Sequence, residues 1–333
     1  MKTTKRTTLI VLALLLTVCL VLPFAGCQPK SDYTIGVLQL VKHNALDAAT
    51  KGFVDAISEA MTKAGKTVTF DVQNAQGDST TCSTIANSFV SKNVDLIMAN
   101  ATTALQASAN ATLTIPILGT SVTEYGVALG LTDFNGTVGN NISGTSDLAP
   151  LTEQADMIVE LVPSAKKIGI LYCSSEPNSK YQADVVKAHL ESLGKGLTCK
   201  VATFSDSNDL RTVAEQLASE SDVIYVPTDN AVASNAPIVN DVCSAKNVPV
   251  FAGEEGICKG CGFATLSISY YNIGRKTGEM AADILLNGKD ISTMPIAYDE
   301  TPVAKFVKSR CEALGITVPS SYVELQIETE TEA

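Results

Sequence analysis

The run Ser174-Ser-Glu-Pro-Asn-Ser179 places small polar side chains at the expected start of a helix. Pro177 suits the first turn of a helix, and Asn178 and Ser179 are of types that cap helix N-termini. Free N–H groups and the positive end of the helix dipole favour an anion at such a position, for example a carboxylate. The run therefore predicts either an anion-binding site or a helix cap with no further role.

Asp229 follows the apolar run 223–226 and directly precedes Asn230. A carboxylate in this position can receive an ammonium group, or it can cap a helix that begins near Asn230. Its two oxygens allow both roles at once. A carboxylate clamp at 174–179 together with an ammonium acceptor at Asp229 would recognise an α-amino acid.

Other candidate residues share a position near the expected ends of strands, where small hydroxyl and amide groups adapt to a polar ligand. His43 either contacts a ligand or is a solvated loop residue with no contact to a ligand. Tyr270 either forms an aromatic wall of the site or packs at a hinge. The full set of candidate ligand-binding residues is Gln39, His43, Leu46, Thr102, Thr103, Ser121, Ser174, Ser175, Glu176, Asn178, Ser179, Asp229, Asn230, Glu254 and Tyr270.

Short apolar runs recur in the same order in two parts of the chain, which indicates duplication of one α/β unit. Gly36 and Gly169 are 133 residues apart, and so are Pro116 and Pro249. Strand-opening prolines are tolerated because the first residue of a strand needs no ladder N–H. The paired runs are 34–39 with 167–172, 94–99 with 221–226, and 115–119 with 248–252.

Each unit alternates β-branched runs with helical runs, such as 45–64 and 179–193. This alternation predicts an α/β fold with two doubly wound parallel-sheet lobes and right-handed crossovers. Ligands bind beyond the carboxyl ends of strands in such sheets, so two facing lobes would enclose one cleft. We expect lobe 1 at 33–147 plus about 272–292, lobe 2 at 148–271 plus about 293–320, and a solvated acidic tail at 321–333.

The composition excludes several classes of protein. The chain has 333 residues, 45% of them hydrophobic, so it can form two buried cores. It carries 24 basic and 35 acidic residues, and this balance opposes binding to a nucleic-acid backbone. No G-x-x-x-x-G-K-[ST] or G-x-S-x-G motif occurs, and His43 and His189 are the only two His. We therefore expect no enzyme activity and no cofactor.

The N-terminus has the pattern of an export signal. Basic residues precede an apolar run from Thr7 to Leu22, and Gly26 and Cys27 follow. The run is short for a membrane span, whereas a secretory signal peptide at 1–26 fits it. Small residues before a cysteine resemble the bacterial lipobox, which implies a lipidated Cys27, a linker at 27–32 and an extracytoplasmic protein anchored to the cell membrane. Plain secretion and an uncleaved membrane anchor are the alternatives.

The cysteines leave their bonding open. Seven remain after Cys19 and Cys27 are set aside, so at least one thiol is free or intermolecular. Cys258 and Cys261 form the one tight pair. They lack the second pair or the nearby His that zinc needs, so no metal site is expected. A local disulfide and two unreacted thiols both remain open for this pair.

Four segments together resemble the TrpX-like family of ABC-transporter substrate-binding proteins, which has the type I periplasmic-binding-protein fold. They are 36–47, 174–179, 226–230 and 270–274, and the resemblance covers about 33–320. It implies capture of a small solute, often an aromatic amino acid such as tryptophan, by hinge closure of two lobes. It also implies a membrane permease and a cytoplasmic ATPase as partners. A sensor of the same fold, which presents its ligand to a signalling partner, is the alternative.

Overall fold

The structure is a computed structural model that describes residues 31–299 and 301–327. The first sheet in these residues has the strand order β11-β5-β4-β3-β1-β2, and every neighbouring pair is parallel. We call this sheet and its helices lobe 1. Its strands are β1 (Tyr33–Gln39), β2 (Val68–Asn74), β3 (Leu96–Asn100), β4 (Ile117–Val122), β5 (Ile142–Ser146) and β11 (Ala297–Tyr298).

The second sheet has the order β13-β12-β10-β9-β8-β6-β7 and defines lobe 2. Its neighbouring strands are parallel except for the antiparallel pair β10 and β12. Its strands are β6 (Lys167–Cys173), β7 (Thr198–Phe204), β8 (Val223–Val226), β9 (Val250–Ala252), β10 (Ala264–Ser267), β12 (Val303–Phe306) and β13 (Val323–Glu324).

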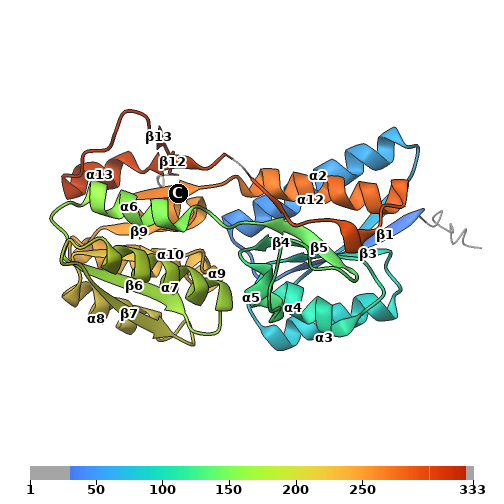
Figure 1. Ribbon diagram of the computed structural model, residues 1–333, viewed down its shortest axis with the longest axis horizontal. Coiled ribbons are helices and arrows are strands. Elements are labelled where there is room, and N and C mark those ends of the chain that lie inside the picture. The colour runs from blue at the N-terminus through green and yellow to red at the C-terminus, as the bar shows by residue number, and fades with distance from the viewer. Residues whose placement is uncertain (1–30, 300, 328–333) are drawn as a thin grey trace, which may run out of the picture. The chain divides into compact units, whose positions relative to one another are not determined.

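Helices follow the strands and cover the sheets, as Figure 1 shows. In lobe 1 these are α2 (Asn44–Lys63), α3 (Ser79–Ser91), α4 (Thr102–Ala111), α5 (Tyr125–Leu129), α12 (Tyr270–Asn287) and the 3₁₀ turn η1 (Ile291–Thr293). In lobe 2 they are α6 (Leu151–Leu161), α7 (Pro177–Ser192), α8 (Leu210–Glu220), α9 (Asn230–Ser234), α10 (Ala236–Ala245), α11 (Glu255–Gly260) and α13 (Lys308–Leu314).

Each sheet is buried on both faces, because successive residues of a strand point to opposite sides. In β3, Leu96 and Met98 join the core beneath α2 and α12, whereas Ile97 and Ala99 join the core beneath α3 and α4. Lobe 2 repeats this arrangement, with one core around α8 and α10 and another around α6 and α7. The doubly wound parallel-sheet fold predicted from the sequence is confirmed.

The two lobes share equivalent hydrogen bonds at equivalent positions. Ile97 N donates to Pro116 O and Ile224 N donates to Pro249 O, each at 2.9 Å. Both prolines therefore stand directly before a strand and use only their carbonyl oxygen in the ladder. The shared bonds support the duplication inferred from the repeated apolar runs.

The chain crosses between the lobes three times. It leaves β5 for α6, leaves β10 for α12, and leaves β11 for β12. We expected the last return to lobe 2 near 293. That boundary was wrong, because Ala297–Tyr298 pairs with Thr145–Ser146 and keeps the chain in lobe 1 until 298.

The start of the expected acidic tail is also corrected. Val323 pairs with Lys305, and Leu325 is buried against the core of lobe 2. The expected signal peptide, most of the linker with Cys27, and residues 328–333 lie outside the described residues. No helix in 31–299 or 301–327 is long and apolar enough to cross a membrane. All seven described cysteines are free thiols, and Cys258 and Cys261 are buried.

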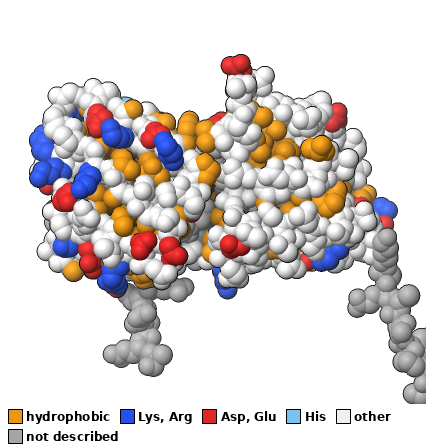
Figure 2. Space-filling view, turned by 90° about the horizontal axis from the view of Figure 1, so that it is seen from below, with side chains coloured by type: hydrophobic (Ala, Val, Ile, Leu, Met, Phe, Trp, Pro, Cys, Tyr) orange, Lys and Arg blue, Asp and Glu red, His pale blue; other side chains and the backbone are white. Residues whose placement is uncertain are grey.

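The solvent faces of α3 and α7 differ in chemistry. On α3, Ser83, Thr84 and Asn87 donate to carbonyl oxygens four residues back, and the helix has no charged residue. On α7, Lys180 pairs with Asp184 and Lys187 pairs with Glu191 at i, i+4 spacing. Figure 2 shows the result, with charged side chains frequent over lobe 2 and sparse over lobe 1 on this face.

Candidate ligand-binding site

A small cavity lies between the lobes at the carboxyl ends of their strands. About 270 Å³ in and around it is free of atoms, part of it open to solvent, and only about 10 Å³ can take the centre of a water molecule. This is about the least that one water molecule needs, so the cavity is narrow. The cavity is lined by His43, Leu46, Ser121, Asp147, Asn178, Thr228, Asp229, Asn230, Ala233, Glu254, Ile257 and Tyr270.

The doubly wound topology explains why these residues meet. His43 follows β1, Ser121 lies near the end of β4, and Asp147 follows β5. In lobe 2, Asp229 follows β8 and Glu254 follows β9. Parallel strands bring their carboxyl ends to one edge, and the two edges face each other across the cavity. Eight of the residues predicted from the sequence line it: His43, Leu46, Ser121, Asn178, Asp229, Asn230, Glu254 and Tyr270.

The predicted clamp at 174–179 is only partly at the cavity. α7 begins at Pro177, and Asn178 lines the cavity while its Nδ2 donates to Thr228 O at 2.9 Å. Ser179 is buried and its Oγ donates to Thr228 O. Ser174 Oγ donates to Phe204 O, away from the cavity. Only the first turn of α7 therefore reaches the cavity.

Glu176 holds the adjacent helix of lobe 2. Its carboxylate accepts from the N–H groups of Asn230 at 3.0 Å and Ala231 at 2.9 Å, at the start of α9. Asn230 Nδ2 also donates to Glu176 Oε2 at 2.7 Å. These bonds fix the orientation of the Asn230 amide, so that its Oδ1 is free to accept from another group.

Asp229 performs the helix-capping role that the sequence left open. Its Oδ1 accepts from Val232 N at 2.8 Å and caps α9, and its Oδ2 accepts from Cys173 N at 2.7 Å. The side chain is buried, with 1% exposed. Asp229 therefore ties β6 to the start of α9.

Glu254 is a second carboxylate whose oxygens bind backbone groups. It accepts from the N–H groups of Gly256 and Ile257 and caps α11. Burial raises the pKa of Glu254 to about 7 and also raises the pKa of Asp229. Burial and the nearby Asp229 charge raise the pKa of Glu176 to about 8. The cavity thus gathers carboxyl groups that are costly to ionise without a cation.

His43 presents a hydrogen-bond acceptor to the cavity. Its Nε2 lies 3.1 Å from Asn230 Oδ1, which is an acceptor because the Asn230 Nδ2 donates to Glu176. Nε2 therefore carries the proton. Burial lowers the pKa of His43, so the ring is neutral and its Nδ1 has a free lone pair. Among the described residues, Nδ1 is buried and has no partner.

Ser121 is held in an unusual backbone conformation. Its φ is 54°, in the left-handed region, and it lies where the register of β4 and β5 shifts. Such backbone strain is often found at binding sites. Its Oγ is buried without a partner among the described residues, so a polar ligand can use it.

Several predicted residues lie elsewhere. Gln39 is buried and bonds with Asp47 and Thr50, which joins β1 to α2. Thr102 is buried in the first turn of α4. A wider groove also lies between the lobes, and about 610 Å³ of it can take the centre of a water molecule. It is lined by Thr103, Ser175, Glu176 and Asn230, among others. Asn230 lines both the groove and the small cavity, so the two lie next to each other.

Three residues of the cavity were not predicted from the sequence: Asp147, Ala233 and Ile257. Nothing in the sequence distinguishes Ala233 and Ile257 from apolar residues of the core. Asp147 follows the strand Ile142–Ser146, whose sequence ISGTS contains one large apolar residue. Its position directly after a strand end would have been the signal, had that polar strand been recognised.

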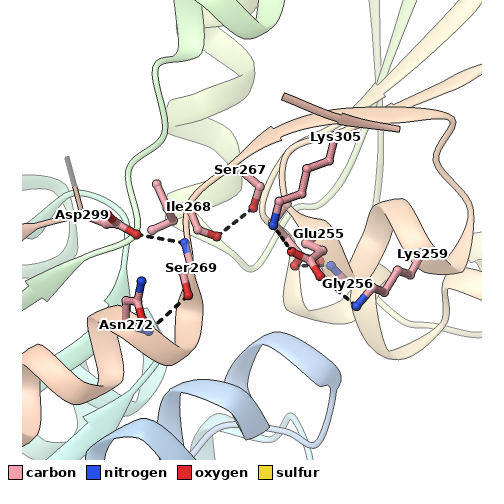
Figure 3. A network of polar contacts seen from close by, with 10 residues as sticks. Glu255, Gly256, Lys259, Ser267, Ile268, Ser269, Asn272, Asp299 and Lys305 are labelled. Atoms are coloured by element: carbon pink, nitrogen blue, oxygen red, sulfur yellow. Dashed lines mark hydrogen bonds and ion pairs between the residues drawn. The ribbon is translucent and has the colours of Figure 1, made fainter. Parts of the chain in front are cut away.

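Two hydrogen bonds tie the three crossings together. Tyr270 OH donates to Asp147 Oδ2 at 2.8 Å and joins the first crossing to the second. Ser269 N donates to Asp299 Oδ2 at 3.0 Å and joins the second to the third, as Figure 3 shows. Figure 3 also shows Glu255 paired with Lys259 and Lys305 beside these segments. The crossings are therefore connected to one another, and Asp147 and Tyr270 belong both to the crossings and to the cavity.

Two α/β lobes, three crossings and an interlobe cavity define a solute-binding protein of the type I periplasmic-binding-protein fold. The chain belongs to the family of ABC transporter substrate binding proteins, whose pattern matches residues 34–329.

The chain is similar to proteins whose names give a ligand. It is 39% identical over 280 residues to the "Tyrosine-binding protein" of Clostridioides difficile (strain R20291), which covers 82% of this chain and 79% of that protein. It superposes with a TM-score of 0.82 on an ABC domain from Streptococcus pneumonia in complex with L-Trp. That domain is 31% identical and the match covers 88% of this chain and 99% of the domain.

One similar solved structure is in an open conformation. It is the ligand-free, open structure of a substrate binding protein with adhesive properties from Clostridium difficile, and it is 38% identical to this chain. The match covers 89% of this chain and 100% of that protein, yet the TM-score is 0.67. The present structure is therefore closer to the L-Trp complex than to a more similar sequence in an open state.

Proposed function

We propose that this chain is the extracytoplasmic solute-binding subunit of an ABC importer, and that its solute is an aromatic L-amino acid, tyrosine or tryptophan. The observation that carries the proposal is the agreement of two relatives above 30% identity, one named for tyrosine and one holding L-Trp. A permease and a cytoplasmic ATPase would be its partners. Cys27, lipidated after removal of 1–26, would anchor it to the membrane.

The chemistry of the cavity supports an amino acid. Unpartnered acceptors at His43 and Asp147 suit an ammonium group, and the first turn of α7 at Asn178 suits a carboxylate. Leu46, Ile257 and Tyr270 supply apolar and aromatic surface for a ring. The candidate ligand residues in the cavity are thus divided between the two ends of an aromatic amino acid.

We predict that L-tyrosine, L-tryptophan or L-phenylalanine raises the melting temperature of the purified protein. A ligand that binds only the folded state stabilises it by about 2.7 kcal/mol at a hundredfold excess over its Kd, which corresponds to a shift of roughly 4 °C or more. A thermal-shift screen that includes L-leucine, L-alanine and L-aspartate checks this. If only a non-aromatic solute raised the melting temperature, an aromatic ligand would be excluded, but the importer role would not be contradicted.

We also predict that the lobes close around the ligand through the three crossings. The narrow cavity cannot admit an amino acid without opening, and the lower TM-score to an open relative supports a hinge motion. Small-angle scattering should therefore show a smaller radius of gyration at saturating ligand than without ligand. An unchanged radius at saturation would contradict closure.

A further inference from the structure

The cavity contains carboxyl groups and no cationic side chain. Asp147, Asp229 and Glu254 line it, and none of its lining residues is Lys or Arg. A buried carboxylate without a cation is costly, because its charge has lost the solvation of water. The cavity is therefore suited to a ligand that brings a positive group of its own.

The three carboxyl groups differ in how their oxygens are used. Both oxygens of Asp229 accept from backbone N–H groups, and so do both oxygens of Glu254. Asp147 Oδ2 accepts from Tyr270 OH, but Asp147 Oδ1 has no hydrogen-bond partner among the described residues. Asp147 is 5% exposed and caps no helix. It is thus the one carboxylate of the cavity with an oxygen free for a ligand.

The surroundings of Asp147 do not compensate its charge. Burial raises its pKa, and this outweighs the opposing effect of the hydrogen bond from the Tyr270 hydroxyl group. Glu254 and Tyr125 lie near enough that the Asp147 charge raises their pKa values as well. An ammonium group in contact with Oδ1 would remove this unfavourable balance.

We propose that Asp147 receives the α-ammonium group of the bound amino acid through Oδ1, with the lone pair of His43 Nδ1 as a second acceptor. Tyr270 is a positioning residue that orients the Asp147 carboxylate through its hydroxyl group. This inference rests on the proposed function and gives Asp229 a structural role in place of ligand contact. Because Asp147 and Tyr270 lie on two different crossings, ammonium binding would also fix the hinge.

The test compares L-tryptophan with 3-indolepropionate, which lacks only the ammonium group. We expect wild-type protein to bind L-tryptophan at least about 30-fold more tightly than 3-indolepropionate. The loss of one partner of a buried charge pair weakens binding by that factor or more. Asp147→Asn keeps the size of the side chain and removes its charge. We expect this variant to bind the two ligands within about threefold of each other.

Further variants separate this role from a structural one. Asp283→Asn, on the solvent side of α12 in lobe 1, should retain the wild-type preference. Tyr270→Phe should reduce the preference for L-tryptophan over 3-indolepropionate only in part. It leaves the Asp147 carboxylate in place but removes the hydroxyl group that donates to it. If Asp147→Asn does not fold, the preference of Tyr270→Phe decides the matter.

The outcomes are distinct. Calorimetric titration of wild type with L-tryptophan, L-tyrosine and L-phenylalanine tests the proposed function, which fails if none of them binds. The preference for the ammonium group tests Asp147. A wild-type preference retained in Asp147→Asn, or one retained in full in Tyr270→Phe, would overturn the assignment.

Discussion

Asp229→Ala is expected to lower the free energy of unfolding by about 2–4 kcal/mol. The substitution removes the cap of α9, worth about 1 kcal/mol, and leaves the buried N–H of Cys173 without an acceptor, at about 1–3 kcal/mol. Denaturant unfolding followed by circular dichroism measures the loss. Because Asp229 and Glu176 repel each other in the folded state, part of this loss will be offset.

Two control variants show whether the loss of stability comes from the buried hydrogen bonds of Asp229 or from the removal of any carboxylate. Asp229→Asn retains one acceptor oxygen and should lose less stability than Asp229→Ala. Asp222 also accepts from two backbone N–H groups, those of Lys166 and Lys167, but near the surface. Asp222→Ala should therefore cost less, because water replaces its bonds. An Asp229→Ala variant with wild-type stability and no amino-acid binding would instead make Asp229 the ammonium acceptor.

Gly274→Ala should also destabilise the fold, by about 1–3 kcal/mol. A Cβ on Gly274 would lie 2.0 Å from Ala49 O, in the close crossing of α12 and α2. The helices would have to separate, and such overpacking exceeds the roughly 1 kcal/mol that alanine adds in helix propensity. His43 precedes α2 and Tyr270 opens α12, so the shift should weaken ligand binding too.

Matched substitutions test whether the close crossing is the cause. Gly52→Ala should destabilise similarly, since its Cβ would lie 2.1 Å from Tyr271 O on the opposite helix. Glu279→Ala changes an exposed residue of α12 and should stay within about 0.5 kcal/mol of wild type. Wild-type stability in Gly274→Ala would show that the helices can separate at little cost.

The fold was predictable where apolar periodicity is strong. The run 167–172 and the helix 179–193 correspond to β6 at Lys167–Cys173 and α7 at Pro177–Ser192. The polar strand β5 was missed, because its burial depends on hydroxyl groups that bond across the lobe. Thr145 Oγ1 lies 2.8 Å from Thr277 Oγ1, 132 residues away. The edge strand β11 is only two residues long, so it carries no sequence signal for the last crossing.

The site was predictable at the level of loop ends but not of individual roles. The strand ends placed His43, Ser121, Asp229 and Glu254 at one cavity. Which carboxylate is free for a ligand depends on bonds that no local pattern shows. The contact between Tyr270 and Asp147, 123 residues apart in sequence, is one of these. The tautomer of His43 likewise depends on Asn230 and Glu176 in the other lobe.

The most direct test of an aromatic amino-acid ligand is the fluorescence of L-tryptophan titrated with purified protein. The chain contains no Trp, so with excitation at the red edge of tyrosine absorption the ligand provides the only indole signal. Transfer of its ring from water into the cavity should shift the emission to the blue, and excess L-tyrosine should reverse the shift by competition. An unshifted spectrum, together with no calorimetric heat for L-tryptophan, L-tyrosine or L-phenylalanine, would contradict the proposed ligand.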